Sequence, residues 1–213
     1  MQNSIVKEHL ENKRVYELMK RAMDIVCSLI GLIVLMPALI LMGILIKLES
    51  KGTIIFSQNR VGKDGVVFKM YKFRSMVSNA EALKEKLVGK NERTGPMFKM
   101  RNDPRVTRIG KFIRRTSIDE LPQLINILKG DMSIVGPRPS LPNEVEQFEE
   151  WMIKRLNVKP GLTCYWQVNG RDNIEFKEWM KLDVKYVNER NMVIDIKLVL
   201  KTFFVLLVDK SGS

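Results

Sequence analysis

The sequence has one histidine and two cysteines, and it lacks the motifs that most directly reveal an enzyme. The single histidine, His9, lies in a polar N-terminal stretch, which argues against a catalytic histidine and against a zinc site of histidine and cysteine. Cys27 and Cys164 do not make a disulfide framework, and two free cysteines fit a reducing, cytoplasmic compartment. There is no Walker loop, kinase glycine-rich loop, internal repeat or low-complexity segment, so the motif-bearing ATPases and kinases are excluded.

Acidic residues are scarce relative to basic ones. The chain has 24 Asp and Glu against 36 Lys and Arg, for a net charge of +12. Such an excess favours an anionic partner, which could be nucleic acid, an acidic membrane surface or a phosphorylated substrate, and charge alone does not choose among them. With 213 residues the chain can form one globular domain with its own core, or a domain plus an appendage.

Residues 25–46 contain no charge at all. They read IVCSLIGLIVLMPALILMGILI, and at about 1.5 Å per residue this run is just long enough to span a bilayer. The run is too long for a signal peptide, and no small-residue cleavage site follows it. A buried core helix is the alternative, but uncharged runs of this length favour a membrane location.

Pro37 divides this run, and both of its flanks are basic. Proline removes a backbone donor and kinks a helix, while the positive-inside rule expects an excess of positive charge on one side only. A helix that enters one leaflet, bends at Pro37 and returns would keep both flanks on the cytoplasmic face. We therefore predict a re-entrant membrane helix over residues 20–48, with a single span as the alternative. Asp24, at its entrance, is expected to pair with a nearby Lys or Arg.

The remaining chain is predicted to be α+β and predominantly helical, with a small β-hairpin and amphipathic interfacial helices. Residues 1–19 would form an N-terminal cytoplasmic extension, and residues 49–213 a cytoplasmic, membrane-associated domain. The hairpin is predicted within residues 52–73, around a polar turn at 63–65. Residues 158–173 are predicted to be a loop because glycine and proline punctuate them. The tail at 191–210 is either a core helix or one lying in the membrane interface.

Basic residues gather at two places in this domain. Lys72 and Arg74 are two apart on the second predicted strand, so they project from one face, as an anion site or as a solvated edge. Arg105 and Arg114 belong to an arginine-rich segment that ends just before two adjacent acids. A solvated basic face is the usual explanation of such a run. Its position just before the two acids makes these arginines candidates for a functional site.

The two acids, Asp119 and Glu120, begin an apolar helix that Gly130 is predicted to end. Acids suit a helix N-terminus because of the helix dipole, so the pair needs no function. A chemical interpretation also fits, because an ionised Asp can attack phosphorus and a neighbouring Glu can hold Mg²⁺. Arginines would then neutralise the phosphoryl oxygens. The residues by themselves lead to phosphoryl chemistry at a membrane and no further.

Six segments in order resemble the bacterial sugar transferase family, the monotopic phosphoglycosyl transferases, over about residues 20–204. They are KRAMDIVCSLIGLIVLMP, FSQNRVG, FKMYKFRSM, DPRVTRIGKFIRRTSIDELPQLINILKGDMSIVGPRP, KPGLTCYWQVNGR and LDVKYV. One departure is Cys164, where many members have glycine, and it puts the local backbone geometry in doubt rather than the chemistry. The chain is also short, so the resemblance implies a minimal catalytic form without the extra N-terminal membrane helices of larger members.

The resemblance implies that a nucleotide diphosphate sugar, usually a UDP-sugar, gives its sugar-1-phosphate to polyprenol phosphate and that UMP is released. This reaction initiates surface glycan assembly at the cytoplasmic face of the bacterial inner membrane. Asp119 would be the nucleophile that carries a covalent phosphosugar, and Glu120, with Asp119, would hold Mg²⁺. Pro37 matches the family's helix-breaking proline. The substrate-binding candidates are Lys72, Arg74, Arg105, Arg114, Pro137, Arg138, Pro139 and Arg171.

The implied partners are the UDP-sugar, polyprenol phosphate and membrane lipid, without nucleic acid, and a homodimer remains an option. Two other functions compete with this one. A membrane-anchored basic binding module without catalysis would explain the charge and the apolar run, although no nucleic-acid motif is recognised. An ordinary glycosyltransferase would release UDP rather than UMP.

Overall fold

The computed structural model describes residues 2–208 apart from 86, 88, 90–99, 101 and 171–173. A long N-terminal helix, α1 (Gln2–Glu49), precedes a β-hairpin and a series of shorter helices. The other elements are β1 (Ile55–Val61), η1 (Lys63–Gly65), β2 (Val67–Phe73), α2 (Ala80–Glu85), α3 (Arg108–Arg115), η3 (Ile118–Glu120), α4 (Gln123–Lys129), β3 (Ser133–Val135), α5 (Pro142–Val145), α6 (Glu150–Ile153), η4 (Lys154–Asn157), β4 (Gly161–Thr163), α7 (Tyr165–Val168), α8 (Phe176–Glu189) and α9 (Met192–Val208). The mostly helical α+β fold with a small hairpin was predicted correctly.

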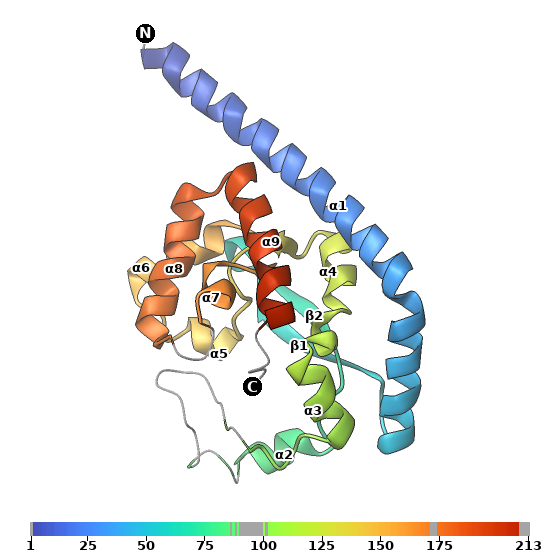
Figure 1. Ribbon diagram of the computed structural model, residues 1–213. Helices are drawn as coiled ribbons and strands as arrows, with labels where there is room; N and C mark the ends of the chain where they lie inside the picture. Colours follow the sequence, from blue (N-terminus) through green and yellow to red (C-terminus); the bar gives the residue numbers. More distant parts are fainter. Residues whose placement is uncertain are drawn as a thin grey trace.

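Helix α1 is continuous through Pro37. Figure 1 shows it curving along one side of the domain, beside α4, without folding back on itself. Among the residues that the structure describes, its stretch Lys13–Glu49 is the one helix long and apolar enough to cross a membrane, and only 17% of its most apolar part is buried in the protein. An apolar surface of this extent is unfavourable in water, so α1 indicates association with a membrane.

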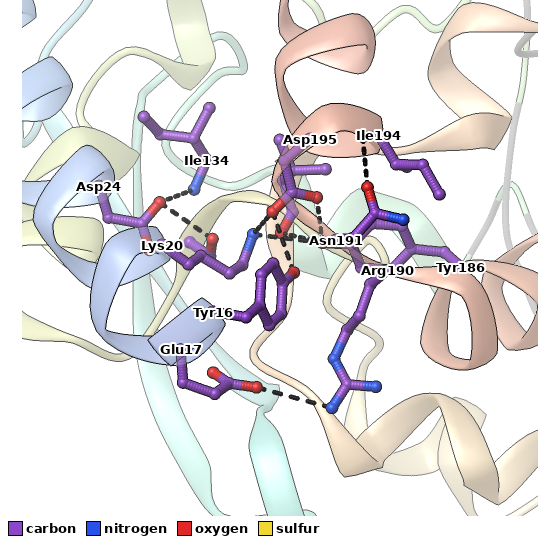
Figure 2. Close-up of polar contacts among 12 residues, drawn as sticks. Tyr16, Glu17, Lys20, Asp24, Ile134, Tyr186, Arg190, Asn191, Ile194 and Asp195 are labelled. Atoms are coloured by element: carbon purple, nitrogen blue, oxygen red, sulfur yellow. Dashed lines mark hydrogen bonds and ion pairs between the residues drawn. The ribbon is translucent and has the colours of Figure 1, made fainter. Parts of the chain in front are cut away.

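One stripe of α1 packs against the rest of the protein through polar groups. Lys20 lies 2.7 Å from a carboxylate oxygen of Asp195 on α9, and both side chains are buried. Tyr16 donates to the same carboxylate at 3.0 Å, and the Tyr186 hydroxyl donates to its other oxygen at 2.8 Å (Figure 2). This cluster joins α1, α8 and α9 at one buried point.

Asp24 lies one turn further along the same stripe. Its carboxylate accepts hydrogen bonds from the Ser133 hydroxyl at 3.0 Å and from the Ile134 amide at 2.9 Å. The predicted basic neighbours are present, since Lys20 and Arg21 interact electrostatically with Asp24. The direct hydrogen-bond donors are groups of β3, because β3 packs against this turn of α1. The membrane helix is therefore tied to the strand that leads into residues 137–139.

The predicted hairpin is confirmed. Strands β1 and β2 pair antiparallel from Ile55 opposite Phe73 to Val61 opposite Val67, and η1 forms the turn. Asp64 in that turn has a positive φ of 55°, a backbone conformation that Asp tolerates better than most residues. Both faces of β2 take part in the core: Met70 packs against α4, and Phe73, on the opposite face, packs against α1 and α3.

A second, parallel pair joins β3 and β4, with Val135 opposite Thr163. The prediction of a loop over residues 158–173 was therefore wrong for residues 161–168, which contain β4 and α7, while residues 171–173 lie outside the described part of the chain. A three-residue strand leaves no periodic pattern in the sequence, and its partner is distant along the chain. Gly136 follows β3, where an added Cβ would lie 2.3 Å from the carbonyl oxygen of Lys159, so only glycine fits.

Helix α9 combines the two alternatives weighed for the C-terminal tail. Asp195 and Leu198 are buried against the core. The outer face carries exposed apolar side chains, namely Val193, Ile196, Leu200, Phe203 and Phe204. A helix with one face in the core and an apolar face outside is suited to lie against a membrane.

Candidate active site

The two adjacent acids lie on a strained turn between α3 and α4. Ser117 has left-handed backbone angles (φ 56°, ψ 15°) and its side chain caps nothing. Asp119 and Glu120 follow in η3, and α4 begins only at Gln123. A non-glycine residue in this conformation costs roughly 1–2 kcal/mol, and such strain gathers at functional sites. Gly130, also left-handed, ends α4 as predicted.

Asp119 is buried, with 8% of its surface exposed. Burial raises the pKa of its carboxyl, and the neighbouring Glu120 adds to this, while Lys72 and Arg114 oppose it. The net direction is upward. The neighbouring cations favour the ionised form of Asp119, which is the form that can act as a nucleophile.

Glu120 has two cationic partners. Lys72 Nζ lies 2.7 Å from Glu120 Oε1, and Arg138 Nη1 lies 3.2 Å from the same oxygen. Burial alone would raise the pKa of Glu120, but these two cations outweigh it and hold the pKa well below its usual range. Glu120 is therefore ionised at neutral pH. Lys72 and Arg138 come from β2 and from the segment after β3, so the fold gathers three distant segments at this carboxylate.

A buried ion pair between Arg155 and Asp183 fixes the backbone of Arg138. Arg155 Nη2 donates to the carbonyl oxygen of Arg138 at 2.6 Å, and Arg155 Nη1 donates to the Ser140 hydroxyl. Asp183 on α8 binds the same guanidinium at 2.7 Å. Neither Arg155 nor Asp183 was a candidate from the sequence. The sequence does not show whether an arginine is buried or exposed, because its burial depends on which segments pack around it. On the other side, the Arg138 guanidinium lies 5.9 Å from the ring centre of Trp166.

Two further basic residues border the site. Arg60 donates to the carbonyl oxygen of Pro139 at 3.0 Å, and burial together with Arg138 lowers its pKa to about 10. Arg60 was not among the substrate-binding candidates from the sequence. Arg114 donates to the Ser75 hydroxyl at 2.8 Å and interacts electrostatically with Asp119. Positive charge therefore surrounds the acid pair from β1, α3 and the segment around residue 138.

The other candidates have partners of their own. Arg74 is buried and donates to the carbonyl oxygens of Lys51 and Ser50, so it caps the C-terminal end of α1. Arg105 binds the carboxylate of Asp103 at 2.7 Å. The carbonyl oxygen of Pro137 accepts from the Gly161 amide at 2.9 Å, which fixes the start of the Pro-Arg-Pro segment. Arg171 lies outside the described residues.

The acid pair offers oxygen ligands of the kind that Mg²⁺ prefers. Within the described part of the chain, no group of three or more His, Cys, Asp or Glu side chains is placed to hold a metal ion. Mg²⁺ commonly uses one or two carboxylates and takes its remaining ligands from water and substrate phosphates. Asp119 and Glu120 fit such a site, in which a cation at Glu120 would compete with Lys72 and Arg138.

Comparison with known proteins agrees with this geometry. The sequence model of the bacterial sugar transferase family matches residues 15–209, a range that includes every residue of the site. The chain belongs to the bacterial sugar transferase family. The family match includes the apolar part of α1 together with the acid pair, so both belong to the family's common unit.

Three curated members of the family show how much of the chain is shared. Galactosyl transferase CpsE of Streptococcus agalactiae serotype III is 50% identical over 190 residues, which cover 89% of this chain and 42% of that protein. The UDP-glucose:undecaprenyl-phosphate glucose-1-phosphate transferase of Escherichia coli is 41% identical over 93% of this chain and 42% of its own length. Exopolysaccharide production protein ExoY of Sinorhizobium fredii is 36% identical, over 86% and 83% respectively. The chain thus spans about two fifths of the first two relatives and most of the third.

Proposed function

We propose that this protein is a phosphoglycosyl transferase that initiates the assembly of a surface polysaccharide. It moves a sugar-1-phosphate from a UDP-sugar to polyprenol phosphate and releases UMP. The observation that carries the proposal is the pair of adjacent acids, the buried Asp119 and the half-buried Glu120, which lies among Lys72, Arg114 and Arg138 beside an apolar helix. The name of the Escherichia coli relative, which specifies UDP-glucose and undecaprenyl phosphate, supports the same substrate classes.

In the first step, a carboxylate oxygen of Asp119 attacks the phosphorus that carries the sugar. The new bond joins this oxygen to phosphorus, and the bond from phosphorus to the bridging oxygen of the diphosphate breaks. UMP leaves with that oxygen and with the electron pair. Asp119 must be ionised to attack, and the positive charges of Lys72 and Arg114 favour its ionised form against the cost of burial.

In the second step, an oxygen of polyprenol phosphate attacks the same phosphorus. The bond from Asp119 to phosphorus breaks, the carboxylate is regenerated, and the product is a polyprenol diphosphate sugar. Arg138 and Lys72 release Glu120 as phosphate oxygens approach, and they neutralise the charge on those oxygens. Asp119 and Glu120 would hold Mg²⁺, which would supply further neutralisation of phosphate charge.

The location that we propose is the cytoplasmic face of the membrane, with both ends of the apolar run of α1 at that face. Helix α1 is continuous through Pro37 in this structure, and the re-entrant bend at that residue belongs to the proposal. The contacts of α1 support this topology. Lys20, before the apolar run, binds α9, while Glu49, after the run, accepts hydrogen bonds from the Arg108 and Ile109 amides at the start of α3. Both ends of the run contact the same domain, so a helix that spans the bilayer would carry part of that polar domain into about 30 Å of hydrocarbon.

The proposal is tested with the two half-reactions kept apart. Purified protein in phosphatidylcholine vesicles is incubated with a UDP-sugar and Mg²⁺, first without and then with polyprenol phosphate. We expect a covalent sugar phosphate on Asp119 in the first case, seen by intact-protein mass spectrometry, and turnover with release of UMP in the second. Release of UDP would indicate an ordinary glycosyltransferase, and neither adduct nor nucleotide release across the set of UDP-sugars would favour a binding module.

A further inference from the structure

Arg60 is a half-buried cation of the site that neither step of the proposed reaction uses. The pairing of β1 with β2 fixes the side of the hairpin from which it projects. Phe56 pairs with Lys72, and Arg60 is four residues further along β1, so Arg60 and Lys72 project from the same face. Lys72 binds Glu120 from that face. Arg60 therefore lies on the side of the hairpin that faces the acid pair.

Neutral groups hold the guanidinium of Arg60. Its Nη1 donates to the carbonyl oxygen of Pro139 at 3.0 Å, and its Nη2 donates to Oε1 of Gln58 at 2.8 Å. Arg155 braces the preceding carbonyl oxygen of the same segment, but its charge is matched by the carboxylate of Asp183. The two groups that accept these hydrogen bonds from Arg60 carry no charge, so they fix its position without neutralising it.

A second guanidinium lies near Arg60. Burial, and then the positive charge of Arg138, lower the pKa of Arg60, while Glu144 and Glu120 oppose this effect. The carboxylate of Glu144 is already engaged by the Leu141 amide, which donates to it at 2.8 Å. Two guanidiniums that are fixed near each other repel, and an anion between them relieves the repulsion. Phosphate suits this place because its oxygens accept charge-assisted hydrogen bonds from both groups.

Arg60 and Asp119 lie toward different sides of the site. Lys72 is the cation that acts most strongly on the Asp119 carboxyl, whereas Arg138 is the cation that acts most strongly on Arg60. In a displacement at phosphorus, the attacking and leaving oxygens lie on opposite sides of the phosphorus atom. A group that Asp119 displaces would therefore leave toward Arg138 and Arg60.

We propose that Arg60, together with Arg138, binds the phosphate that Asp119 displaces, which is the phosphate of UMP. The inference rests on the proposed function and adds a substrate-binding residue to it. UMP gains negative charge as the bond to the bridging oxygen breaks, and two guanidiniums at this place stabilise that charge. In the second step the acceptor displaces Asp119, so its phosphate enters from the side on which UMP left. One anion site thus serves UMP and polyprenol phosphate in turn.

The first test compares Arg60→Gln with Lys69→Gln. Lys69 is exposed on the opposite face of the same hairpin, so its variant is the matched control for the loss of one positive charge. UMP and uridine are added as inhibitors of adduct formation. For Arg60→Gln we expect the half-inhibiting concentration of UMP to rise about tenfold, or about 1.4 kcal/mol, while that of uridine, which lacks the phosphate, is unchanged. The half-saturating concentration of polyprenyl phosphate in the discharge step should rise by a similar factor, and Lys69→Gln should match the unmodified protein.

A double-mutant cycle separates direct binding from a purely positioning role. If Arg60 acted only by holding the Pro139 carbonyl, and through it the Arg138 side chain, Arg60→Gln would have no further effect in an Arg138→Ala background. Direct binding predicts that Arg60→Gln still weakens inhibition by UMP in that background. The absence of any further weakening would overturn the proposal.

The second test uses the unmodified protein, so it does not depend on the folding of a variant. Phenylglyoxal modifies accessible arginines, and peptide mass spectrometry locates the modified positions. UMP at saturating concentration should protect Arg60, whereas uridine should not, and the exposed Arg115 should react in every sample. If Arg60 does not react in the free protein, or reacts equally with and without UMP, it is not a phosphate-binding residue.

The outcomes separate this inference from the proposed function. If the unmodified protein forms the adduct and releases UMP but Arg60→Gln and Lys69→Gln respond alike to UMP and to polyprenyl phosphate, the assignment of Arg60 fails while the proposed function stands. If the unmodified protein forms no adduct and releases no UMP, the proposed function itself fails.

Discussion

Arg155 Nη2 donates a hydrogen bond to the backbone oxygen of Arg138 at 2.6 Å. Both Arg155 and its partner Asp183 are buried, so the Arg155 guanidinium is fixed in place. It holds the backbone of Arg138, whose side chain binds Glu120. Arg155→Lys keeps the charge and loses the forked geometry. We expect turnover to fall about tenfold or more, since a hydrogen bond to a charged group contributes roughly 1.5–3 kcal/mol.

A double-mutant cycle measures whether Arg155 acts through Arg138. In an Arg138→Ala background, Arg155→Lys should reduce turnover little further, because the side chain that it positions is already absent. Equal losses in the two backgrounds would show that Arg155 acts on something else.

Asp119→Asn should abolish the covalent adduct while the protein remains folded. An amide is a very weak nucleophile at phosphorus. Burial raises the pKa of Asp119, so the folded state holds this proton more tightly than the unfolded state. The stability contributed by the protonated group is present at low pH and is lost as pH rises through the raised pKa, so the ionised group costs stability at neutral pH. Thermal unfolding in detergent should therefore show an equal or higher Tm for Asp119→Asn.

One control variant and one pH measurement accompany this prediction. Asp64→Asn, in the exposed hairpin turn, should leave both adduct and Tm unchanged, because Asn also tolerates a positive φ. In the unmodified protein, adduct formation should fall as pH is lowered, and the fall should begin above the pH at which an ordinary Asp is protonated. An adduct found on Asp119→Asn would contradict the mechanism.

Arg138→Ala should weaken turnover strongly and leave membrane association intact. The loss of one or two charge-assisted hydrogen bonds to phosphate, at roughly 1.5–3 kcal/mol each, implies on the order of 10- to 1000-fold in rate. Arg115→Ala, an exposed position on α3, is the matched control for the loss of one positive charge. Steady-state UMP release and the fraction of protein retained on membranes after a carbonate wash are the two measurements. Near-native turnover would remove Arg138 from the site.

Asp195→Ala should destabilise the protein severely, because it leaves Lys20 buried without its carboxylate. The removal of one partner of a buried pair costs about 3–5 kcal/mol, whereas a surface pair such as Glu178 with Lys181 contributes about 0–1 kcal/mol. Urea unfolding in detergent micelles of Asp195→Ala and Glu178→Ala compares the two. The double variant Lys20→Met with Asp195→Leu should recover part of the loss, and no recovery would mean that the tyrosines carry the cluster.

Membrane topology is tested by labelling single cysteines. In a Cys27→Ser background, Ser4→Cys and Ser211→Cys should both be protected from an impermeant maleimide in intact cells and labelled after lysis. That result is expected because both flanks of the apolar run are basic and both contact the same domain. Labelling of one position in intact cells would show that α1 spans the membrane. Pro37→Ala should shift the protein toward that outcome, because it removes the break in the helical hydrogen bonds.

Local features of this protein followed from the sequence because they depend on neighbours along the chain. The uncharged run predicted the apolar helix, and the residues at 63–65 predicted the hairpin turn. The adjacency of Asp119 and Glu120 is covalent, and Gly130 ends α4 because glycine adopts a positive φ at little cost. No tertiary information was needed for any of these.

The partners of the acid pair were decided by packing. In the sequence, Lys72 and Arg74 were equally good candidates for an anion site. In the structure Lys72 binds Glu120, whereas Arg74 caps α1 because the chain beyond β2 turns toward the end of that helix. Arg155 and Asp183 gave no signal, since burial of a charge depends on which segments cover it. The parallel pairing of β3 with β4, which sets the Pro-Arg-Pro segment beside the acids, joins segments distant along the chain. Those contacts exist only once the chain has folded, so the sequence alone determined the two adjacent acids and the tertiary structure decided which charges surround them.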